Sequence, residues 1–280
     1  MGAQMTQTSG ALAGRENRRS VMLTFDDGTA VVTGGGSGIG RATAVLLGRA
    51  GVPVVVADID EDGMSETVSR IRSAGGDALG VTLDVSDQSS VNAAFDKAEA
   101  WKGAVTVLVN SAGILRVEPF DTVSREDFER VMTVNVTGSF QCAQRATKGM
   151  KAKGFGRIVN LSSVSGYRAG VGRTAYGTSK AAVAQLTRQL ALELGRYGIT
   201  ANAVAPGTTM TSMTAKAYTD ENKANFLKMI PSGFIAEPED IAPSIVFLAS
   251  LQARYVNGHT MPVDGGYLAS GMMQTAGLEL

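Results

Sequence analysis

Short apolar runs alternate along this chain with longer stretches in which apolar residues recur every three or four positions. The first run, Thr29–Thr33, is β-branched and apolar, and a glycine cluster ends it, which indicates a strand buried on both faces. Runs of the same kind recur to the end of the chain. They predict further strands at Val52–Ala57, Ala78–Leu83, Val105–Val109, Arg157–Leu161, Ile199–Ala205 and Val256–Pro262.

The stretches between these strands carry the residue spacing of helices. In Arg41–Ala50, for example, the apolar residues Ala42, Val45 and Leu46 share one face. The same spacing predicts helices at Glu61–Ala74, around Val91–Trp101, over the long stretch Ser124–Lys153, at Thr174–Tyr197 and at Pro238–Ser250.

Strands that alternate with helices, each strand nearly all apolar, indicate a parallel sheet covered by helices on both faces. We therefore predict an α/β fold with a doubly wound, seven-stranded parallel sheet of the Rossmann type. No linker or internal repeat interrupts the chain between Thr29 and Leu268, so we expect a single domain over residues 29–280. Residues 1–28 are predicted to form a disordered arm, and the loop-like stretch 208–236 is predicted to form a lid.

Composition sets limits on partners and compartment. Hydrophobic residues make up 44% of the chain and charged residues 19%, which allows a sizeable core. The 26 basic and 26 acidic side chains balance, which argues against nucleic acid and a membrane surface as partners. No apolar run approaches the roughly 18 residues of a spanning helix. One cysteine, Cys142, and one histidine, His259, exclude an internal disulfide and a Cys/His zinc site, so we expect a cytoplasmic protein without a metal centre.

A glycine-rich turn, Thr33–Gly40, joins the first predicted strand to the first predicted helix. At such a turn the backbone approaches a pyrophosphate closely, and the N–H groups of the helix N-terminus bind it. Asp58 follows about twenty positions later, where a carboxylate accepts hydrogen bonds from the adenosine ribose of NAD and repels the 2′-phosphate of NADP. Ser37 is neutral and no Arg or Lys stands nearby to receive that phosphate, so the sequence predicts NAD. A tight turn and a solvated acidic loop remain the alternatives for each motif alone.

Tyr176 and Lys180 stand one turn apart on the predicted helix Thr174–Tyr197, so both project from the same face. A phenol has an ordinary pKa of about 10, and a neighbouring ammonium group lowers that pKa by favouring the phenolate. Ser163 ends the preceding strand, where its hydroxyl can hold a substrate oxygen. Tyr176 and Lys180 alone are more typical of a surface pair, but Ser163 precedes the tyrosine by thirteen residues and so accompanies them.

Taken together, these motifs resemble those of the short-chain dehydrogenase/reductase family in its compact single-domain form, from about Thr29 to Tyr267. The matches follow the order and spacing of the family. They are the turn Thr33–Gly40, Asp84–Val85 after the third strand, Asn110–Gly113 after the fourth, and then Asn135, Ser163, Tyr176, Lys180, Pro206–Gly207, Thr211 and Asp264–Gly266. One departure is Ser111, where many members carry a second asparagine.

The resemblance implies a role for each matched residue. Tyr176 is expected to donate or accept the hydroxyl proton, while Lys180 lowers its pKa and hydrogen-bonds the nicotinamide ribose. Ser163 is expected to orient the substrate carbonyl, and Asn135 to hold a water that relays protons from Lys180. Besides Tyr176 and Lys180, the residues expected to contact NAD are Gly34, Ser37, Gly38, Ile39, Gly40, Asp58, Asp84, Val85, Asn110, Ala112, Gly113, Pro206, Gly207, Thr209 and Thr211. Taken singly, Asn135 fits a buried amide, and Asp84 a helix cap, equally well.

The resemblance also implies an NAD-dependent oxidoreductase that transfers a hydride between the nicotinamide and a secondary alcohol or ketone, with a polyol, a sugar-like compound or a hydroxy acid as substrate. A 3-oxoacyl-thioester reductase of the same family is one alternative, against which Asp58 argues. An NAD-binding protein without catalysis is another, against which the intact Ser163, Tyr176 and Lys180 argue.

Substrate choice is expected to depend on Leu115–Pro119, Val164–Arg173 and the lid. The candidate side chains there are Arg116, Tyr167, Arg168, Arg173, Met210, Met213, Phe226 and Met229. The family further implies a homotetramer, with the helices around 121–150 and 174–197 at one interface and the last strand and the tail 270–280 at another.

Overall fold

The computed structural model describes residues 22–215 and 219–271. Within these residues, seven parallel strands form one sheet in the order β3-β2-β1-β4-β5-β6-β7, which confirms the predicted fold class. The strands are β1 (Thr29–Thr33), β2 (Val54–Asp58), β3 (Ala78–Thr82), β4 (Val105–Asn110), β5 (Gly156–Leu161), β6 (Ile199–Pro206) and β7 (Thr260–Val263). The last strand begins later than the predicted Val256, because Val256 still belongs to a turn in which its N–H donates to the Ala253 carbonyl at 2.9 Å.

The order of the strands reverses at β1. The chain first adds β2 and β3 on one side of β1 and then returns to place β4 on its other side. In a parallel sheet of this kind, ligands bind in the crevice outside the carboxyl ends of the strands at the point of reversal. The topology therefore directs attention to the loops that follow β1 and β4.

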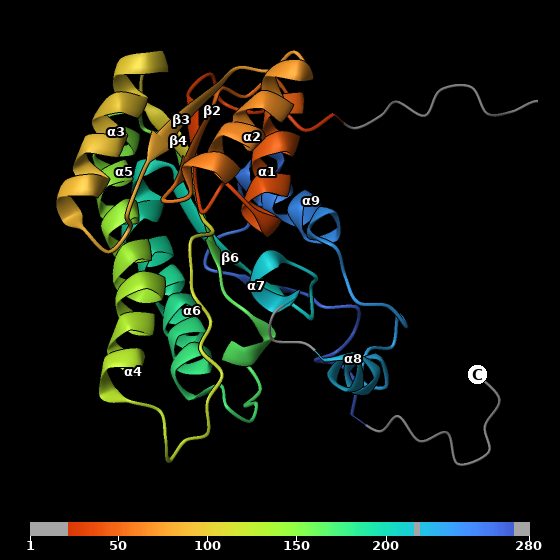
Figure 1. The fold of residues 1–280 in the computed structure, drawn as a ribbon. Helices are drawn as coiled ribbons and strands as arrows, with labels where there is room; N and C mark the ends of the chain where they lie inside the picture. The colour runs from red at the N-terminus through yellow and green to blue at the C-terminus, as the bar shows by residue number, and fades with distance from the viewer. Residues whose placement is uncertain (1–21, 216–218, 272–280) are drawn as a thin grey trace, which may run out of the picture.

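Helices cover both faces of the sheet (Figure 1). On one face lie α1, α2 and α9, and on the other lie α3, α5 and α6. The helices are α1 (Gly38–Arg49), α2 (Glu61–Ser73), α3 (Gln88–Lys102), α4 (Arg125–Met132), α5 (Gly138–Lys153), α6 (Thr174–Leu194), α7 (Ser212–Ala215), α8 (Asp220–Leu227) and α9 (Pro238–Ala249), with 3₁₀ turns at Val164–Gly166, Gly195–Tyr197 and Leu251–Ala253.

The sheet separates two hydrophobic cores, because successive side chains of a strand point to opposite faces. Val32 faces the first core, where it joins Leu47 of α1 and Ile245 of α9. Val31 faces the second, with Phe95 of α3 and further residues of α5 and α6. Burial of each such side chain contributes about 1.5–3 kcal/mol to the free energy of folding. This packing fixes the strand ends that carry the candidate site.

The long helix predicted over Ser124–Lys153 is interrupted, which corrects that prediction. A five-residue π-helix, η1 (Thr133–Thr137), separates α4 from α5. Its wider turn places Asn135 inside the molecule with 1% of its surface exposed, and the Ser139 hydroxyl donates to the Asn135 carbonyl oxygen at 2.8 Å. A π-helical turn often marks a functional position in an otherwise regular helix.

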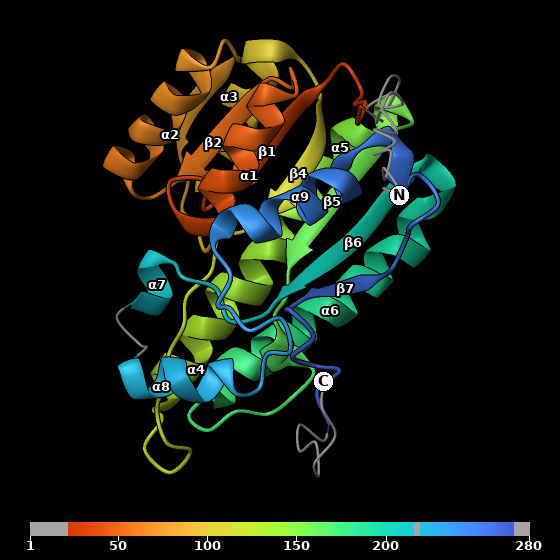
Figure 2. The same cartoon turned by 90° about the vertical axis from the view of Figure 1, so that its right-hand side faces the viewer.

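Parts of the predicted arm and of the predicted lid pack against the domain. Residues 1–21 of the arm, residues 216–218 of the lid and residues 272–280 of the tail lie outside the described residues. Residues 22–28 are packed: Leu23 and Phe25 lie against the first core, and the Leu251 N–H donates to the Thr24 carbonyl at 2.8 Å. In the lid, a bridge between Thr209 and Ala236 joins the two ends of the excursion, and α7 and α8 lie beyond one end of the sheet (Figure 2).

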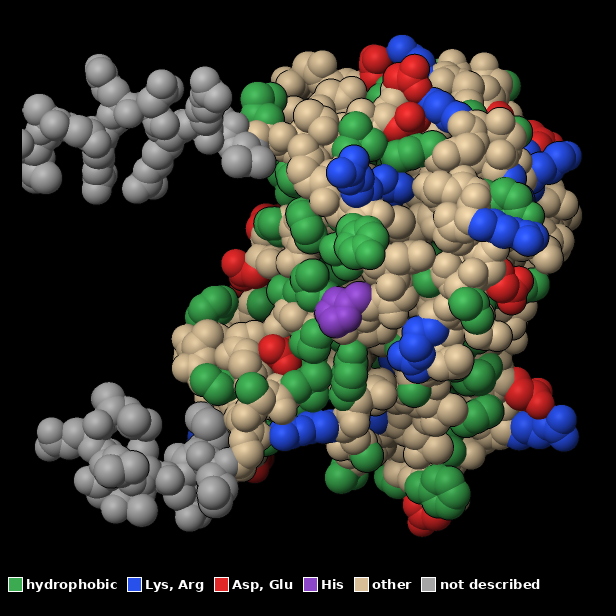
Figure 3. Space-filling model, turned by 180° about the vertical axis from the view of Figure 1, so that it is seen from behind, with side chains coloured by type: hydrophobic (Ala, Val, Ile, Leu, Met, Phe, Trp, Pro, Cys, Tyr) green, Lys and Arg blue, Asp and Glu red, His purple; other side chains and the backbone are tan. Residues whose placement is uncertain are grey.

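The surface shows no field of one sign on the face drawn in Figure 3, where acidic and basic side chains are interspersed and the single histidine lies among hydrophobic side chains. Within residues 22–215 and 219–271, no helix combines the length and the apolar character needed to span a bilayer.

Candidate active site

A cavity of about 920 Å³ lies at the carboxyl ends of the strands. Its lining comes from the segments that follow β1, β2, β3, β4, β5 and β6, together with α6 and the lid. The cavity therefore occupies the crevice at the reversal of strand order, where parallel sheets bind nucleotides.

The glycine-rich turn after β1 has no room for side chains. Gly34 has a positive φ of 64°, and a Cβ added there would lie 2.8 Å from the Ala112 backbone. A Cβ on Gly40 would lie 2.1 Å from the Gly34 carbonyl oxygen. This tight path brings Ser37 and the first turn of α1 to the wall of the cavity. Such a cradle fits a pyrophosphate, because bare backbone and a helix N-terminus meet there.

Thr33 joins the turns after β1 and β4, a role that is absent from the sequence prediction. Its hydroxyl oxygen accepts hydrogen bonds from the N–H groups of Ser111 and Ala112, each at 3.2 Å. A β-branched residue at the end of a buried strand is predicted only to pack within the sheet. In the sequence, only the position of Thr33 at the start of the glycine turn indicates its contact with the turn after β4.

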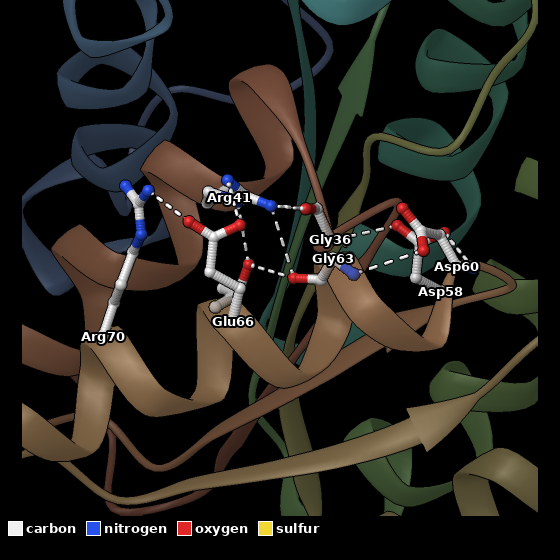
Figure 4. Close-up of polar contacts among 8 residues, drawn as sticks. Gly36, Arg41, Asp58, Asp60, Gly63, Glu66 and Arg70 are labelled. Atoms are coloured by element: carbon white, nitrogen blue, oxygen red, sulfur yellow. Dashed lines mark hydrogen bonds and ion pairs between the residues drawn. The ribbon is translucent and has the colours of Figure 1, made fainter.

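Asp58 stands at the opposite end of the cavity from the catalytic candidates, with both carboxylate oxygens fixed (Figure 4). Oδ2 accepts from the Gly36 N–H at 2.8 Å, and Oδ1 accepts from the Asp60 N–H at 3.0 Å. A carboxylate has about four lone-pair sites, so acceptor capacity remains for two ribose hydroxyls. The position and the chemistry of Asp58 fit the adenosine ribose of NAD.

A basic residue lies beside the glycine turn but outside the cavity lining, which leaves the prediction that no Arg or Lys receives a 2′-phosphate there uncontradicted. Arg41 of α1 folds back under the glycine turn, and its Nε donates to the Gly36 carbonyl at 3.0 Å (Figure 4). Its guanidinium also forms an ion pair with Glu66 at 2.9 Å. Hydrogen bonding to Arg70 and the charge of Arg41 lower the pKa of Glu66. Arg41 is therefore neutralised on the far side of the turn, and it is absent from the cavity lining.

Most residues predicted to contact NAD line the cavity. They are Gly34, Ser37, Gly38, Ile39, Asp58, Asp84, Val85, Ala112, Gly113, Tyr176, Lys180, Pro206, Gly207, Thr209 and Thr211. Gly40 and Asn110 lie behind this lining. The Asn110 amide donates to the Ser139 carbonyl at 3.2 Å and to Asn160 Oδ1 at 2.9 Å, so it braces β4 against its neighbours.

Lys180 is a buried cation beside the phenol ring of Tyr176. Only 5% of its surface is exposed, and burial lowers the pKa of its ammonium group to about 8. Nζ donates to the Leu161 carbonyl at 2.7 Å and lies 5.6 Å from the centroid of the Tyr176 ring. The two side chains predicted to act together are therefore neighbours in the fold.

Ser163 and Asn135 occupy different positions relative to the cavity. Ser163 lines it, and its Oγ accepts from the Ser165 N–H at 3.1 Å. Asn135 lies behind the lining. Its amide accepts from the Ile114 N–H at 2.8 Å and donates to the Ile114 carbonyl at 3.0 Å and to the Ser179 hydroxyl at 2.9 Å. The side chain of Asn135 therefore fixes the loop after β4 against α6.

Some of the residues predicted to contact the substrate line the cavity, and others do not. Arg168, Arg173, Met213, Phe226 and Met229 line the cavity, whereas Arg116, Tyr167 and Met210 do not. Arg116 forms ion pairs with Glu118 and Asp127, and the Tyr167 hydroxyl donates to the Thr260 carbonyl at 2.9 Å.

Known proteins with the same architecture identify the family. A family model described as enoyl-(acyl carrier protein) reductase matches residues 34–268. The cis-4-hydroxycyclohexanecarboxylate dehydrogenase of Sinomonas cyclohexanicum is 41% identical over 246 residues, which cover 88% of this chain and 98% of that protein.

Two solved structures extend the comparison. A 7α-hydroxysteroid dehydrogenase complexed with NADH and 7-oxo glycochenodeoxycholic acid superposes with a TM-score of 0.85 at 34% identity, covering 88% of this chain and 96% of that one. A gluconate 5-dehydrogenase of Burkholderia cenocepacia, in complex with NADP and tartrate, gives a TM-score of 0.85 at 35% identity, covering 89% and 98%. The chain belongs to the short-chain dehydrogenase/reductase family and is an oxidoreductase that acts on CH–OH groups.

Proposed function

We propose that this protein is an NAD-dependent dehydrogenase of a secondary alcohol on an apolar ring, with Tyr176 as general acid and base. The observation that carries the proposal is the cavity itself, which has Asp58 at one end and Ser163, Tyr176 and Lys180 at the other. Relatives that act on a hydroxycyclohexane and on a hydroxysteroid support a ring alcohol.

The walls at the substrate end support an apolar skeleton over the predicted polyol or sugar-like substrate. They include Ile114, Leu115, Val164, Phe226 and Met229. Polyol hydroxyls that face these apolar side chains would lack partners, and each unpaired buried hydroxyl costs about 1–3 kcal/mol. A ring with one reacting hydroxyl avoids that cost.

In the proposed mechanism, bound NAD supplies the acceptor for the hydride that leaves the carbinol carbon. Tyr176 accepts the hydroxyl proton during oxidation and returns it during reduction. Ser163 donates a hydrogen bond to the substrate oxygen and so orients it toward the phenol. A positioned acid or base of this kind contributes about 10²–10⁴-fold to the rate.

Lys180 has two roles in this proposal. Its ammonium group stabilises the phenolate of Tyr176, and its lowered pKa of about 8 allows it to pass a proton onward near neutral pH. Asn135 supports this proton transfer because its side chain fixes the backbone of Ile114. The neighbouring Gly113 lies between Asn135 and the Lys180 ammonium group. A Cβ on Gly113 would lie 3.1 Å from Asn135 Oδ1 and 3.5 Å from Lys180 Nζ.

NAD is proposed over NADP because of Asp58. Its carboxylate is fixed beside the turn, where it accepts ribose hydroxyls and repels a 2′-phosphate. Arg41, the basic residue closest to the turn on α1, is paired with Glu66 and bound to the Gly36 carbonyl. Its charge is therefore directed away from the position of that phosphate.

Steady-state turnover with NAD and NADP in parallel tests the proposal. The panel contains ring secondary alcohols, polyols and a 3-oxoacyl thioester. We expect turnover with NAD and a ring alcohol. Turnover only with NADP and the thioester would contradict the proposal and favour the reductase alternative, whereas cofactor binding without turnover of any compound would favour the non-catalytic alternative.

The proposal includes a cytoplasmic homotetramer. Phe140 of α5 is 44% exposed and Leu192 of α6 is 80% exposed in the single chain, so both helices present apolar side chains that a neighbouring subunit can cover. Size-exclusion chromatography with multi-angle light scattering of the purified protein should give the mass of four chains. A monomer at micromolar concentration would remove this part of the proposal.

A further inference from the structure

Positive charge collects at the substrate end of the cavity. The lining contains the cationic side chains Arg130, Arg168, Arg173 and Lys180. The acidic side chains of the lining, Asp58 and Asp84, follow β2 and β3 and so belong to the adenosine end. A neutral ring alcohol gives no reason for this separation of charge.

The four cations differ in what already binds them. Lys180 donates to the Leu161 carbonyl at 2.7 Å and serves Tyr176. The Arg168 guanidinium donates to the carbonyls of Tyr267, Leu268 and Ser270 at 3.3, 3.3 and 2.9 Å, so it holds the turn at the end of the described chain. Arg130 is exposed on α4. Among the described residues, none of these three cations combines freedom from polar partners with a contact to the Tyr176 ring.

Arg173 has both properties. It is half-buried at the residue that precedes α6, and its Cζ lies 5.7 Å from the centroid of the Tyr176 ring. Within residues 22–215 and 219–271, its guanidinium makes no hydrogen bond or ion pair. The N-terminus of α6 adds further positive potential at the same place. A partly buried guanidinium without an acidic partner is a receptor for an anion.

We infer that Arg173 binds a carboxylate of the substrate, and that the substrate is therefore a ring alcohol that carries an anionic group on the side of the ring remote from the hydroxyl. The inference rests on the proposed function, because it places the reacting hydroxyl at Tyr176. Arg173 directly precedes α6 and Tyr176 lies in the first turn of that helix, so one small molecule reaches both when its hydroxyl and carboxylate are separated by about one six-membered ring. The apolar walls hold the ring between these two polar ends.

The strength of a guanidinium–carboxylate contact determines how much affinity the loss of Arg173 should remove. A guanidinium binds a carboxylate with two parallel hydrogen bonds, and hydrogen bonds to charged groups are among the strongest in proteins. Loss of such a contact is expected to weaken binding by about 10–100-fold. Lysine reproduces the charge without the two-pronged geometry, so Arg173→Lys should recover only part of the affinity.

Binding of two probes to the enzyme–NADH complex tests the inference. The probes are cyclohexanecarboxylate and cyclohexanecarboxamide, which share shape and differ in charge, and the readout is isothermal titration calorimetry. The variants are Arg173→Ala, Arg173→Lys, Arg130→Ala and the control Arg116→Ala, whose guanidinium is paired with Glu118 and Asp127 outside the cavity. NADH fluorescence is titrated first in every variant to establish that the fold and the cofactor site are intact.

We expect wild type to prefer the carboxylate by at least about tenfold, and Arg173→Ala to remove that preference while leaving carboxamide binding unchanged. Equal weakening of both probes, unchanged carboxylate binding, the same loss in Arg130→Ala instead of Arg173→Ala, or no binding of either probe to wild type would each overturn the inference. Failure of wild type to bind NADH would instead overturn the proposed function, so the two failures are distinguished.

Discussion

Replacement of Lys180 by methionine tests whether the active-site lysine is a buried charge that the fold carries at a cost. The pKa of Lys180 falls from 10.5 to about 8 in the folded protein because burial disfavours its charged form. At about 1.4 kcal/mol per pH unit, this fall corresponds to about 3 kcal/mol. Below pH 8 both the folded and the unfolded chain hold the proton, so the wild-type protein bears the full cost there.

The cost is relieved as the pH rises. Between pH 8 and 10.5 the unfolded chain binds the proton that the folded chain has lost, so the free energy of unfolding of wild type increases with pH. Methionine fills similar space without charge. We therefore expect Lys180→Met to be more stable than wild type by about 2–3 kcal/mol at pH 7, after allowing about 1 kcal/mol for the lost bond to the Leu161 carbonyl. By pH 10 that advantage should disappear.

Urea unfolding, followed by circular dichroism at pH 7 and pH 10, measures the difference in free energy of unfolding between Lys180→Met and wild type. Both chains carry Tyr176→Phe, because removal of Lys180 would also change the titration of the neighbouring phenol. The effects of the remaining titrating groups then cancel when the two chains are compared at each pH. Lys148→Met, at an exposed position of α5, is the matched control. A stability difference between Lys180→Met and wild type that stays constant with pH would refute the reasoning.

Three further changes test the cofactor site and its support. Asp58→Ala removes the ribose acceptor and the repulsion of a 2′-phosphate, so kcat/KM for NAD should fall about 10–100-fold while kcat/KM for NADP rises; unchanged use of NAD would contradict the assignment. Gly40→Ala forces a Cβ to within 2.1 Å of the Gly34 carbonyl, so the turn must move, and NADH affinity measured by fluorescence should fall at least about tenfold, with near wild-type affinity as the contrary result. Asn135→Ala leaves the partly buried N–H and carbonyl of Ile114 without their side-chain partner, so thermal unfolding should show a loss of about 1–3 kcal/mol, and a loss below about 0.5 kcal/mol would show that Asn135 does not fix this loop.

The sheet and the helices that cover it were predictable because the strands are largely apolar runs and those helices carry an apolar stripe. The helices α7 and α8 were not predicted, because they lie in the stretch 208–236 that was expected to be a loop and bury no residue among those described. The sheet order then follows from the rules for parallel strands, which bring the residues after β1, β2, β4 and β5 to one edge. The π-helix at Thr133–Thr137 left no such mark, because one extra residue shifts the apolar stripe too little to break the helical spacing.

Arg41 shows why the details of the site were harder to predict. On α1 it occupies a position whose spacing is typical of a solvent-facing residue. Its side chain nevertheless turns back to the Gly36 carbonyl, because that carbonyl and Glu66 of α2 both need a donor there. Contacts between residues 36, 41 and 66 depend on how the turn and two helices pack, and no local pattern encodes them. The same holds for Asn135, whose residue type was predicted to matter but whose partners come from the loop after β4 and from α6.

The most direct test of the central claim is the turnover of Tyr176→Phe with NAD and a ring alcohol that wild type oxidises, measured with NADH binding to the same preparation. We expect turnover to fall at least about 10²-fold while NADH affinity stays within about twofold of wild type. Turnover that survives the loss of the phenol hydroxyl would contradict Tyr176 as the acid and base, and the chemistry would then have to be assigned to another group in the cavity.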